Sequence, residues 1–521
     1  MKILSRRLGS LVLVAALGAG CGSSSPSTPG QGGSTASSGG AAALGGTQNS
    51  RGGNGGTPAT GGVGQGSSSG GATAQGGSTH TGGTSASGAA ASAGSPASAG
   101  STASGGSANS GGASMGGAPD ASGGGAVGGP DLSVELYDPT QLPRFDIELP
   151  PASIAALNLV TGSDDPRQDV YVTGSLKYGS ETVSNIGIRI KGEGSFQKLD
   201  RKPPFKLKFD EFVDKQEFRG LRRMAFNNLF EDASFIAERL AYDVYRAAGL
   251  PAPRCNSALV YVNGTFYGVY TNVEAEDKTF LKRWFPTDGG NLYEEGQVDF
   301  VPGAETKFDL ETNETANDRT DLRNLIAAVQ AATPATFLQD VGGLLDTAQW
   351  LKFTAVEAAV NQWDMYAYTV FYMNNFRIYN DPTSKKFAFI PWGHDMSMKP
   401  FRDSRKPYVR LFALARQGDR ASGSVSSGVL FQKCLQSPAC KTAYSAAVRE
   451  VITTYEGLSL EATATRYYNQ VKPHVAMDTR KNTCCGSPPT LTNAGFEAGY
   501  QEVLTTIRGR VAALEADLAA Q

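Results

Sequence analysis

Two aspartates and an asparagine lie close together in the chain and have the side chains needed to hold metal-bound phosphates. Asp364 follows Asn361-Gln362-Trp363, Asn375 comes shortly after it, and Asp395 ends the segment Trp392-Gly393-His394-Asp395. Phosphoryl transfer needs one carboxylate to orient the acceptor hydroxyl, and a carboxylate and an amide to ligate a hard cation. The spacing therefore favours phosphoryl transfer.

The order of these residues along the chain strengthens this interpretation. A loop with an aspartate, a pair of strands and a second aspartate follow one another in the layout that protein kinases use. The alternative is that Asp364 and Asp395 cap helices or turns, as most loop aspartates do. A sheet-rich segment before the set favours the functional interpretation.

A glycine-containing loop in the sheet-rich segment is a candidate phosphate contact. Gly192 and Gly194 lie in Lys191-Gly192-Glu193-Gly194-Ser195, where glycine allows backbone amides to approach phosphate oxygens. The alternative is an ordinary turn. Lys206 or Lys208, on the next predicted strand, could reach a phosphate as a point charge, or could only solubilise a sheet edge.

Two glutamates complete the candidate cofactor-binding set. Glu238 lies on a helix predicted for residues 234–248 and could pair with Lys206 or Lys208, or could face solvent. Glu274 ends a predicted hairpin, where a nucleotide would bind between two lobes. Its alternative role is to cap a helix that begins near Asp277.

Hydrophobic periodicity predicts an α+β fold with a sheet-rich lobe at 131–290 and a helical lobe at 291–521. The apolar alternation of strands and the Asn-Gly turn of a hairpin precede helical spacing that starts near residue 320. The expected elements are strands 169–178, 186–191 and 205–209, a helix 234–248, hairpins 259–270 and 376–390, and C-terminal helices of which the last covers 493–519.

The first 21 residues have the pattern of a bacterial lipoprotein signal peptide. A basic start precedes the apolar run 11–17, which is too short to span a bilayer stably. Residues 18–21 then predict lipidation of Cys21 and an exported protein of the cell envelope. The alternative is an ordinary signal peptide in which Cys21 is incidental.

Residues 22–130 consist largely of glycine, serine, alanine and threonine. Such a segment cannot bury enough apolar surface to offset chain entropy, so we expect a disordered tether between membrane and folded part. A stalk modified on its serines and threonines is the alternative.

Charge and cysteine content restrict the function further. A net charge of -2 and a pI of about 6.1 provide no broad basic surface for nucleic acid, and three separated histidines cannot alone form a zinc site.

Export favours disulfides among the remaining cysteines. Cys434 and Cys440 are close enough in sequence to pair, and Cys484 or Cys485 could reach one of them. Because Cys255 makes this number odd, at least one thiol stays free or pairs outside the chain.

At these residues the chain resembles the spore coat protein H (CotH) kinase family. The phrases that carry the resemblance are 189–195 (RIKGEGS), 202–209 (KPPFKLKF), 262–270 (VNGTFYGVY) with Glu274, 290–293 (GNLY), Asp364 with Asn375, and 390–395 (IPWGHD). The resemblance covers about residues 135 to 405. It implies an atypical protein-kinase fold with two lobes, and transfer of phosphate from ATP to serine or threonine residues of secreted or surface proteins.

The resemblance also implies residue roles. Asp364 corresponds to the catalytic aspartate, and Asp395 and Asn375 to the ligands of Mg²⁺ or a similar ion. Lys206 or Lys208 corresponds to the lysine that contacts phosphate, and Glu274 to a hinge-like position.

The chain departs from the family at Gly393, where Trp-Asp-x-Asp is common. The missing carboxylate lowers local negative charge and puts activity in question. Two other classes therefore stay open: a kinase-like surface module that binds without turnover, and a metal-dependent hydrolase that uses the same acids.

Overall fold

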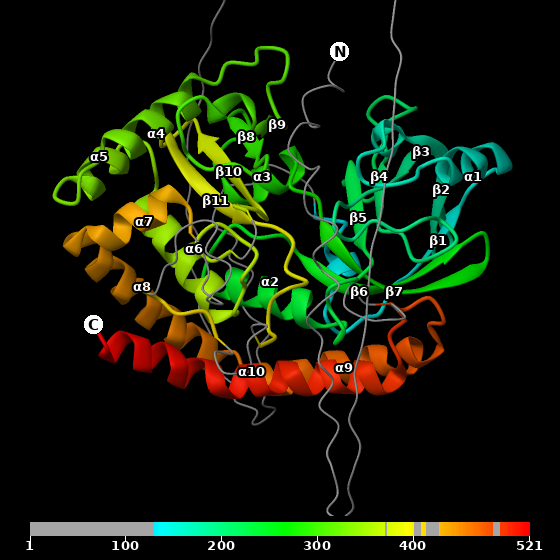
Figure 1. Cartoon of the computed structure of the whole chain (residues 1–521). Coiled ribbons are helices and arrows are strands. Elements are labelled where there is room, and N and C mark those ends of the chain that lie inside the picture. The colour runs from blue at the N-terminus through cyan, green and yellow to red at the C-terminus, as the bar shows by residue number, and fades with distance from the viewer. Residues whose placement is uncertain (1–129, 370–371, 401–407, 413–426, 483–489) are drawn as a thin grey trace, which may run out of the picture. The chain divides into compact units, whose positions relative to one another are not determined.

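The computed structural model describes residues 130–369, 372–400, 408–412, 427–482 and 490–521, which belong to one compact unit. Cys21, the predicted signal peptide and tether, and Cys484 and Cys485 lie outside the described residues. Within them, strands dominate the first part and helices the last, so the predicted α+β class is confirmed (Figure 1).

Seven strands close into a barrel in the order β1-β2-β3-β4-β5-β7-β6, with β1 and β6 parallel. Ile186, Ile188 and Ile190 of β3 and Phe205 and Leu207 of β4 are fully buried, because alternate side chains of each strand point into the barrel. The strands are β1 (Arg144–Glu148), β2 (Val172–Tyr178), β3 (Glu181–Ile190), β4 (Phe205–Lys208), β5 (Arg223–Asn227), β6 (Cys255–Val262) and β7 (Thr265–Glu274).

The predicted strands and the Asn-Gly hairpin correspond to β2, β3, β4, β6 and β7. Asn263 and Gly264 both have positive φ, at 47° and 76°, as a tight hairpin turn requires. The strands β1 and β5 were not predicted. Each has only five residues, too few to give a clear alternation.

A second sheet has the order β11-β10-β8-β9 and is surrounded by helices (Figure 1). Its strands are β8 (Asn291–Glu294), β9 (Asp309–Leu310), β10 (Phe376–Asp381) and β11 (Lys386–Pro391). The helices are α1 (Pro151–Asn158), α2 (Ala237–Ala247), α3 (Lys278–Trp284), α4 (Thr320–Ala331), α5 (Phe337–Gly342), α6 (Thr347–Ala359), α7 (Val429–Gln436), α8 (Pro438–Gly457), α9 (Leu460–Met477) and α10 (Asn493–Ala519). Short 3-10 turns occupy η1 (Val134–Tyr137), η2 (Pro166–Asp169) and η3 (Ala304–Thr306).

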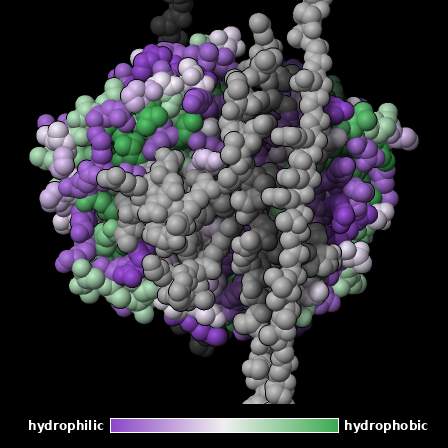
Figure 2. Space-filling view, viewed as in Figure 1, coloured by the Kyte–Doolittle hydropathy of each residue, from purple (hydrophilic) through white to green (hydrophobic). Residues whose placement is uncertain are grey.

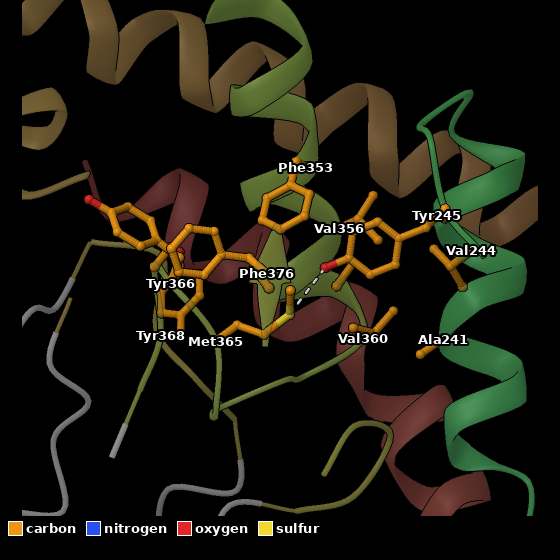
Figure 3. Close-up of a cluster of buried hydrophobic side chains, with 14 of the residues drawn as sticks. Ala241, Val244, Tyr245, Phe353, Val356, Val360, Met365, Tyr366, Tyr368 and Phe376 are labelled. Carbon is orange, nitrogen blue, oxygen red and sulfur yellow. Dashed lines mark hydrogen bonds between the residues drawn. The ribbon is translucent and has the colours of Figure 1, made fainter. Parts of the chain in front are cut away.

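Helix α2 joins the barrel to the helical part. The residue at its N-cap position is Ile236, and the Asp232 carboxylate accepts a hydrogen bond from the backbone N–H of Ala237, the first residue of the helix, at 2.8 Å. On its buried face, Tyr245 packs beside Phe353 of α6, and its hydroxyl contacts the sulfur of Met365 (Figure 3). The helix therefore lies directly against the loop that carries Asp364.

A disulfide joins Cys434 of α7 to Cys440 of α8, as their short separation predicts, and Cys255 is a buried free thiol.

On the face in Figure 2, hydrophobic residues of the described part form separate patches among hydrophilic ones. No helix among the described residues has the length and apolarity that a bilayer crossing requires.

A buried ion pair fixes the barrel to the C-terminal helices. The Nζ of Lys202, before β4, lies 2.7 Å from Oδ2 of Asp478, which follows α9, and both side chains are almost completely buried. Gly268 of β7 lies so close to this carboxylate that a Cβ atom there would overlap Asp478 Oδ2. A larger residue at 268 would displace the carboxylate.

We expect Lys202→Met to destabilise the protein by about 3–5 kcal/mol, because it leaves the Asp478 carboxylate buried without its counter-charge. Adding Asp478→Leu should recover much of this loss, since the pair is then replaced by apolar groups. Arg144→Met is the control: its pair with Asp146 is largely exposed, and it should cost less than about 1 kcal/mol. Urea denaturation measures all three, and equal losses for Lys202→Met and Arg144→Met would contradict the prediction.

Candidate functional site

Asp364 and Asn375 meet where two segments of the helical part come together. Asp364 lies in the loop after α6, and Asn375 immediately precedes β10. The Asn375 amide Nδ2 donates to Oδ2 of Asp364 at 3.0 Å and to its backbone carbonyl at 2.7 Å. Asn374 Nδ2 lies 3.4 Å from the same Oδ2. Both residues have the positions that the sequence pattern predicted relative to the hairpin.

Asp395 lies close enough to Asp364 for the charges of the two carboxylates to interact. Burial, and then the nearby Asp395 carboxylate, raise the pKa of Asp364 to about 8. Burial also raises the pKa of Asp395, and the positive charges of Lys399 and Lys191 oppose that shift. The other carboxylate oxygen of Asp364, Oδ1, is buried and has no hydrogen-bond partner among the described residues. The two acids therefore form one electrostatic site.

Gly393 lies against the Asn375 side chain. Its φ is +62°, and a Cβ atom at this position would overlap Oδ1 of Asn375. The backbone N–H of Trp392 also donates to the Asn375 carbonyl at 3.0 Å. In this chain the Asn375 amide therefore fills the space that a side chain at 393 would need.

Lys191, which the sequence-based interpretation did not select, interacts through its charge with both Glu238 and Asp395. It lies at the end of β3, and its Nζ donates to Asn227 Oδ1 at 2.6 Å, while Asn227 Nδ2 donates to Glu238 Oε1 at 2.8 Å. Burial lowers the pKa of Lys191, and the negative charges of Glu238 and Asp395 act against that shift.

Glu238 is fully buried, and burial raises its pKa, with Asp395 as the next cause. It also accepts a hydrogen bond from the Thr271 hydroxyl. The predicted lysine–glutamate pairing thus has a counterpart, with Lys191 in place of Lys206 or Lys208 and Asn227 as the bridge.

Lys206, Lys208 and Glu274 lie among other partners. Lys208 forms an ion pair with Glu211 at 2.6 Å. Burial and Arg189 lower the pKa of Lys206, and the carboxylates that oppose this belong to the second sheet and its surroundings. Glu274 is buried and forms ion pairs with Arg254, at 2.9 Å, and with Arg283. These partners give Glu274 a structural environment between β7 and α3.

The loop with Gly192 and Gly194 begins directly after Lys191. Gly192 has a φ of +90°, and its carbonyl accepts a hydrogen bond from Gln168 Nε2 at 2.7 Å. At Gly194, by contrast, a Cβ atom would meet no heavy atom within 4 Å. Glu193 between them accepts from Gln297 Nε2 at 2.6 Å. The loop is thus held at one glycine and open at the other.

Two charged residues near the acids were not predicted. The Nζ of Lys399 donates to the Glu231 carbonyl at 2.5 Å, and Lys399 is the strongest charge that opposes protonation of Asp395. The Glu231 carboxylate helps to raise the pKa of Asp364. Neither residue belongs to a recognisable motif. Lys191 had a usable signal, because it stands at the junction of a strand and a glycine-containing loop.

The donor set fits the divalent cation that phosphoryl transfer implies. The Asp395 carboxylate and the Asn375 amide oxygen are ligands of the kind that Mg²⁺ takes, and Oδ1 of the adjacent Asp364 is buried without a partner among the described residues. Within the described ranges no group of three His, Cys, Asp or Glu residues could hold a metal alone.

Comparison with known proteins gives the class and then the family. The chain is 23% identical over 363 residues to the inner spore coat protein H of Bacillus subtilis (strain 168), covering 66% of this chain and 91% of that protein. The model of the family described as CotH kinase protein matches residues 188–514, more than half of the chain. The protein is therefore kinase-like, and it belongs to the CotH kinase family.

A crystal structure of the Helicobacter pylori proinflammatory kinase CtkA also matches. The match covers 67% of this chain and 93% of that chain, at 11% identity and a TM-score of 0.22. A TM-score this low gives no residue-level correspondence, so the site rests on the side chains of this chain.

A buried glutamate supports the loop that carries Asp364. Glu357 of α6 is fully buried, and its carboxylate accepts the backbone N–H groups of Ala367 at 2.9 Å and Tyr368 at 2.8 Å. Burial raises the pKa of Glu357 well above its ordinary value of 4.5, and these two hydrogen bonds act against the shift. The folded protein therefore retains a proton that the unfolded chain releases.

The contribution of Glu357 to stability should consequently fall as pH rises above about 4.5, because at this residue the folded state then binds more protons than the unfolded state. One proton corresponds to at most about 1.4 kcal/mol per pH unit. Glu357→Gln has the same shape, keeps an acceptor and does not titrate, so its stability should fall less between pH 5 and pH 8. Urea denaturation at the two pH values measures this, and parallel pH dependence in both proteins would contradict it.

The contact between Gly393 and Asn375 gives a prediction about the family's usual aspartate. Gly393→Asp should destabilise the protein, because the new side chain overlaps the Asn375 amide and the residue must adopt a positive φ. We expect a loss of roughly 1–2 kcal/mol from the backbone alone. Gly162→Asp is the control, since that position has open space. Urea denaturation measures both variants, and equal stability of Gly393→Asp and Gly162→Asp would contradict the prediction.

Proposed function

We propose that this protein is an exported, membrane-tethered protein kinase that transfers phosphate from ATP to serine or threonine residues of surface or secreted proteins. Membership of the CotH kinase family supports the reaction class. The single observation that carries the proposal is the joining of Asp364 to Asn375 by the Asn375 amide, in the same electrostatic site as Asp395.

Each residue has a chemical task in this proposal. Asp395 and Asn375 would hold Mg²⁺ or a similar ion, which supplies positive charge to the phosphates. Asp364 accepts or orients the proton of the acceptor hydroxyl. Lys191 provides a point charge for a phosphate oxygen, and Glu238 keeps it in place through Asn227.

The glycine-containing loop extends the phosphate site. Gly194 leaves its backbone open to an approaching ligand, and Gly192 adopts the positive φ that turns the loop after Lys191. Lys206, Lys208 and Glu274 have a smaller part in the proposal, because their partners are Glu211 for Lys208, arginines for Glu274 and charges near the second sheet for Lys206.

Export and lipidation of Cys21 belong to the same proposal. The relative in Bacillus subtilis is named as a spore coat protein, which agrees with a surface location. The serine-rich segment 22–130 would place acceptor residues on the same chain. An outside location requires ATP that is released, or action before or during export.

We expect Asp364→Asn and Asp395→Asn each to reduce phosphate transfer by on the order of 10²–10⁴-fold, without loss of folding. Lys191→Met should also reduce it. Lys208→Met is the control and should retain activity, because its side chain pairs with Glu211. The measurement is phosphate incorporation into the purified full chain and into dephosphorylated casein, read by mass spectrometry with ATP and Mg²⁺ or Mn²⁺.

The same experiment separates the alternatives. Nucleotide binding without transfer in the wild-type protein would replace the proposal with a binding module. Release of free phosphate without labelled protein would replace it with a hydrolase. Equal transfer by the wild-type protein and both aspartate variants would remove the assigned site.

A further inference from the structure

Gln362 connects the two loops that carry the acids. It lies between α6 and Asp364 and is fully buried. Its side-chain Oε1 accepts the backbone N–H groups of Trp363 at 3.0 Å and Asp364 at 3.3 Å. Its Nε2 donates to the carbonyl of Gly393 at 3.0 Å. One amide thus binds the Asp364 loop with its oxygen and the Asp395 loop with its nitrogen.

The two ends of this bridge lie next to the reacting side chains. Asp364 is itself one of the bound residues, and Gly393 lies two positions before Asp395. Gly393 also lies against the Asn375 side chain, which in turn bonds to Asp364. A shift of the Gly393 carbonyl would therefore move the backbone before Asp395 relative to both Asp364 and Asn375.

Asn361, the residue before Gln362, makes a second connection, to the segment that follows Asp395. Asn361 Nδ2 donates to the carbonyl of Lys399 at 2.7 Å, and its Oδ1 accepts from the N–H of Val409 at 3.0 Å. The N–H of Met398 donates to the carbonyl of Val360 at 2.7 Å. The segment after Asp395 is thus fixed to the end of α6 independently of Gln362. Removing the Gln362 bridge should therefore disturb the placement of Asp395 without releasing the whole segment.

Only a side chain with both a donor and an acceptor can make this bridge. Asparagine carries the same amide but is one methylene shorter, so it cannot reach from the backbone N–H groups of Trp363 and Asp364 to the Gly393 carbonyl. Methionine fills a similar volume and offers neither bond. Buried backbone groups that lose their partner are costly, so the loops would rearrange to recover hydrogen bonds.

We infer that Gln362 is a positioning residue that fixes the separation of Asp364 from Asp395 and so sets the affinity of the site for metal-bound nucleotide. This inference rests on the proposed function, in which these acids face MgATP. The bridge itself is independent of turnover, so it can be tested by binding alone.

The chain offers a matched control in Gln349 of α6. Its Nε2 donates to the Phe389 carbonyl at 2.7 Å, and its Oε1 accepts from the Phe389 N–H at 2.9 Å. This glutamine thus joins α6 to β11 through the same kind of two-sided amide contact, and it does not bond to either acid-bearing loop. Gln349→Met should therefore measure how much stability is lost with a two-sided amide contact when neither acid-bearing loop is affected.

The experiment measures binding of MnATP, and of ATP without metal, to the full chain by calorimetry, together with thermal unfolding. We expect Gln362→Met to weaken MnATP binding about 10-fold more than it weakens metal-free ATP binding. Gln349→Met should lower the melting temperature similarly and leave the MnATP affinity near that of the wild type. Equal MnATP affinity in Gln362→Met and Gln349→Met would overturn the inference.

Gln362→Asn provides a second test if Gln362→Met does not fold. It is preferred to Gln362→Glu, whose buried carboxyl group can be protonated and then donate. Gln362→Asn keeps the amide but is too short to span both loops, so it should also weaken MnATP binding, and wild-type affinity in this variant would overturn the inference. A wild-type protein that binds MnATP without transferring phosphate would refute the proposed function and leave the role of Gln362 to be judged by binding. A wild-type protein that does not bind MnATP overturns both.

Discussion

The contact between the Asn375 amide and Asp364 is the interaction on which the rest of the site depends. It joins the loop after α6 to the residue before β10, and so fixes a carboxylate beside the start of a central strand of the second sheet. Because β10 pairs with β11, and the segment with Asp395 follows β11 directly, the second acid is carried to the same place. The short β10–β11 hairpin thus brings together the loop with Asp364 and the segment with Asp395, which are separated in sequence.

The barrel supplies the positive charge of Lys191 to this site. Strand β3 ends at Ile190, and the next residue, Lys191, faces Glu238 of α2 through Asn227. Since α2 also packs against α6 and against Met365 beside the first acid, its position affects both the lysine and the acidic loop (Figure 3). Helix α2 is the element through which barrel and helical part share one site.

The sequence predicts the elements well where a local pattern decides them, and less well where a long-range contact decides them. The Asn-Gly hairpin, the final helix and the α+β order follow from local signals. The closure of the barrel does not, because the parallel pairing of β1 with β6 joins distant segments. The choice of lysine also depends on contacts between distant segments, because Lys191 after β3 reaches Glu238 of α2 through Asn227 of β5. Lys206 and Lys208 had the more regular strand pattern, whereas Lys191 became adjacent to Glu238 only through folding.

The acids of the site have shifted pKa values because they are buried and not fully paired. Asp364 has its pKa raised to about 8, and one of its oxygens has no partner among the described residues. A protein designed only for stability would remove such a group, since buried unpaired acids cost free energy. The two lysines nearest Asp395 oppose its protonation but do not neutralise the whole set, to which Glu231 and Glu238 also contribute. A cation bound beside these acids would favour their ionised forms and lower their pKa values. Neighbouring groups with strongly shifted pKa values mark a candidate functional site, and the acids here are those that the family resemblance selects.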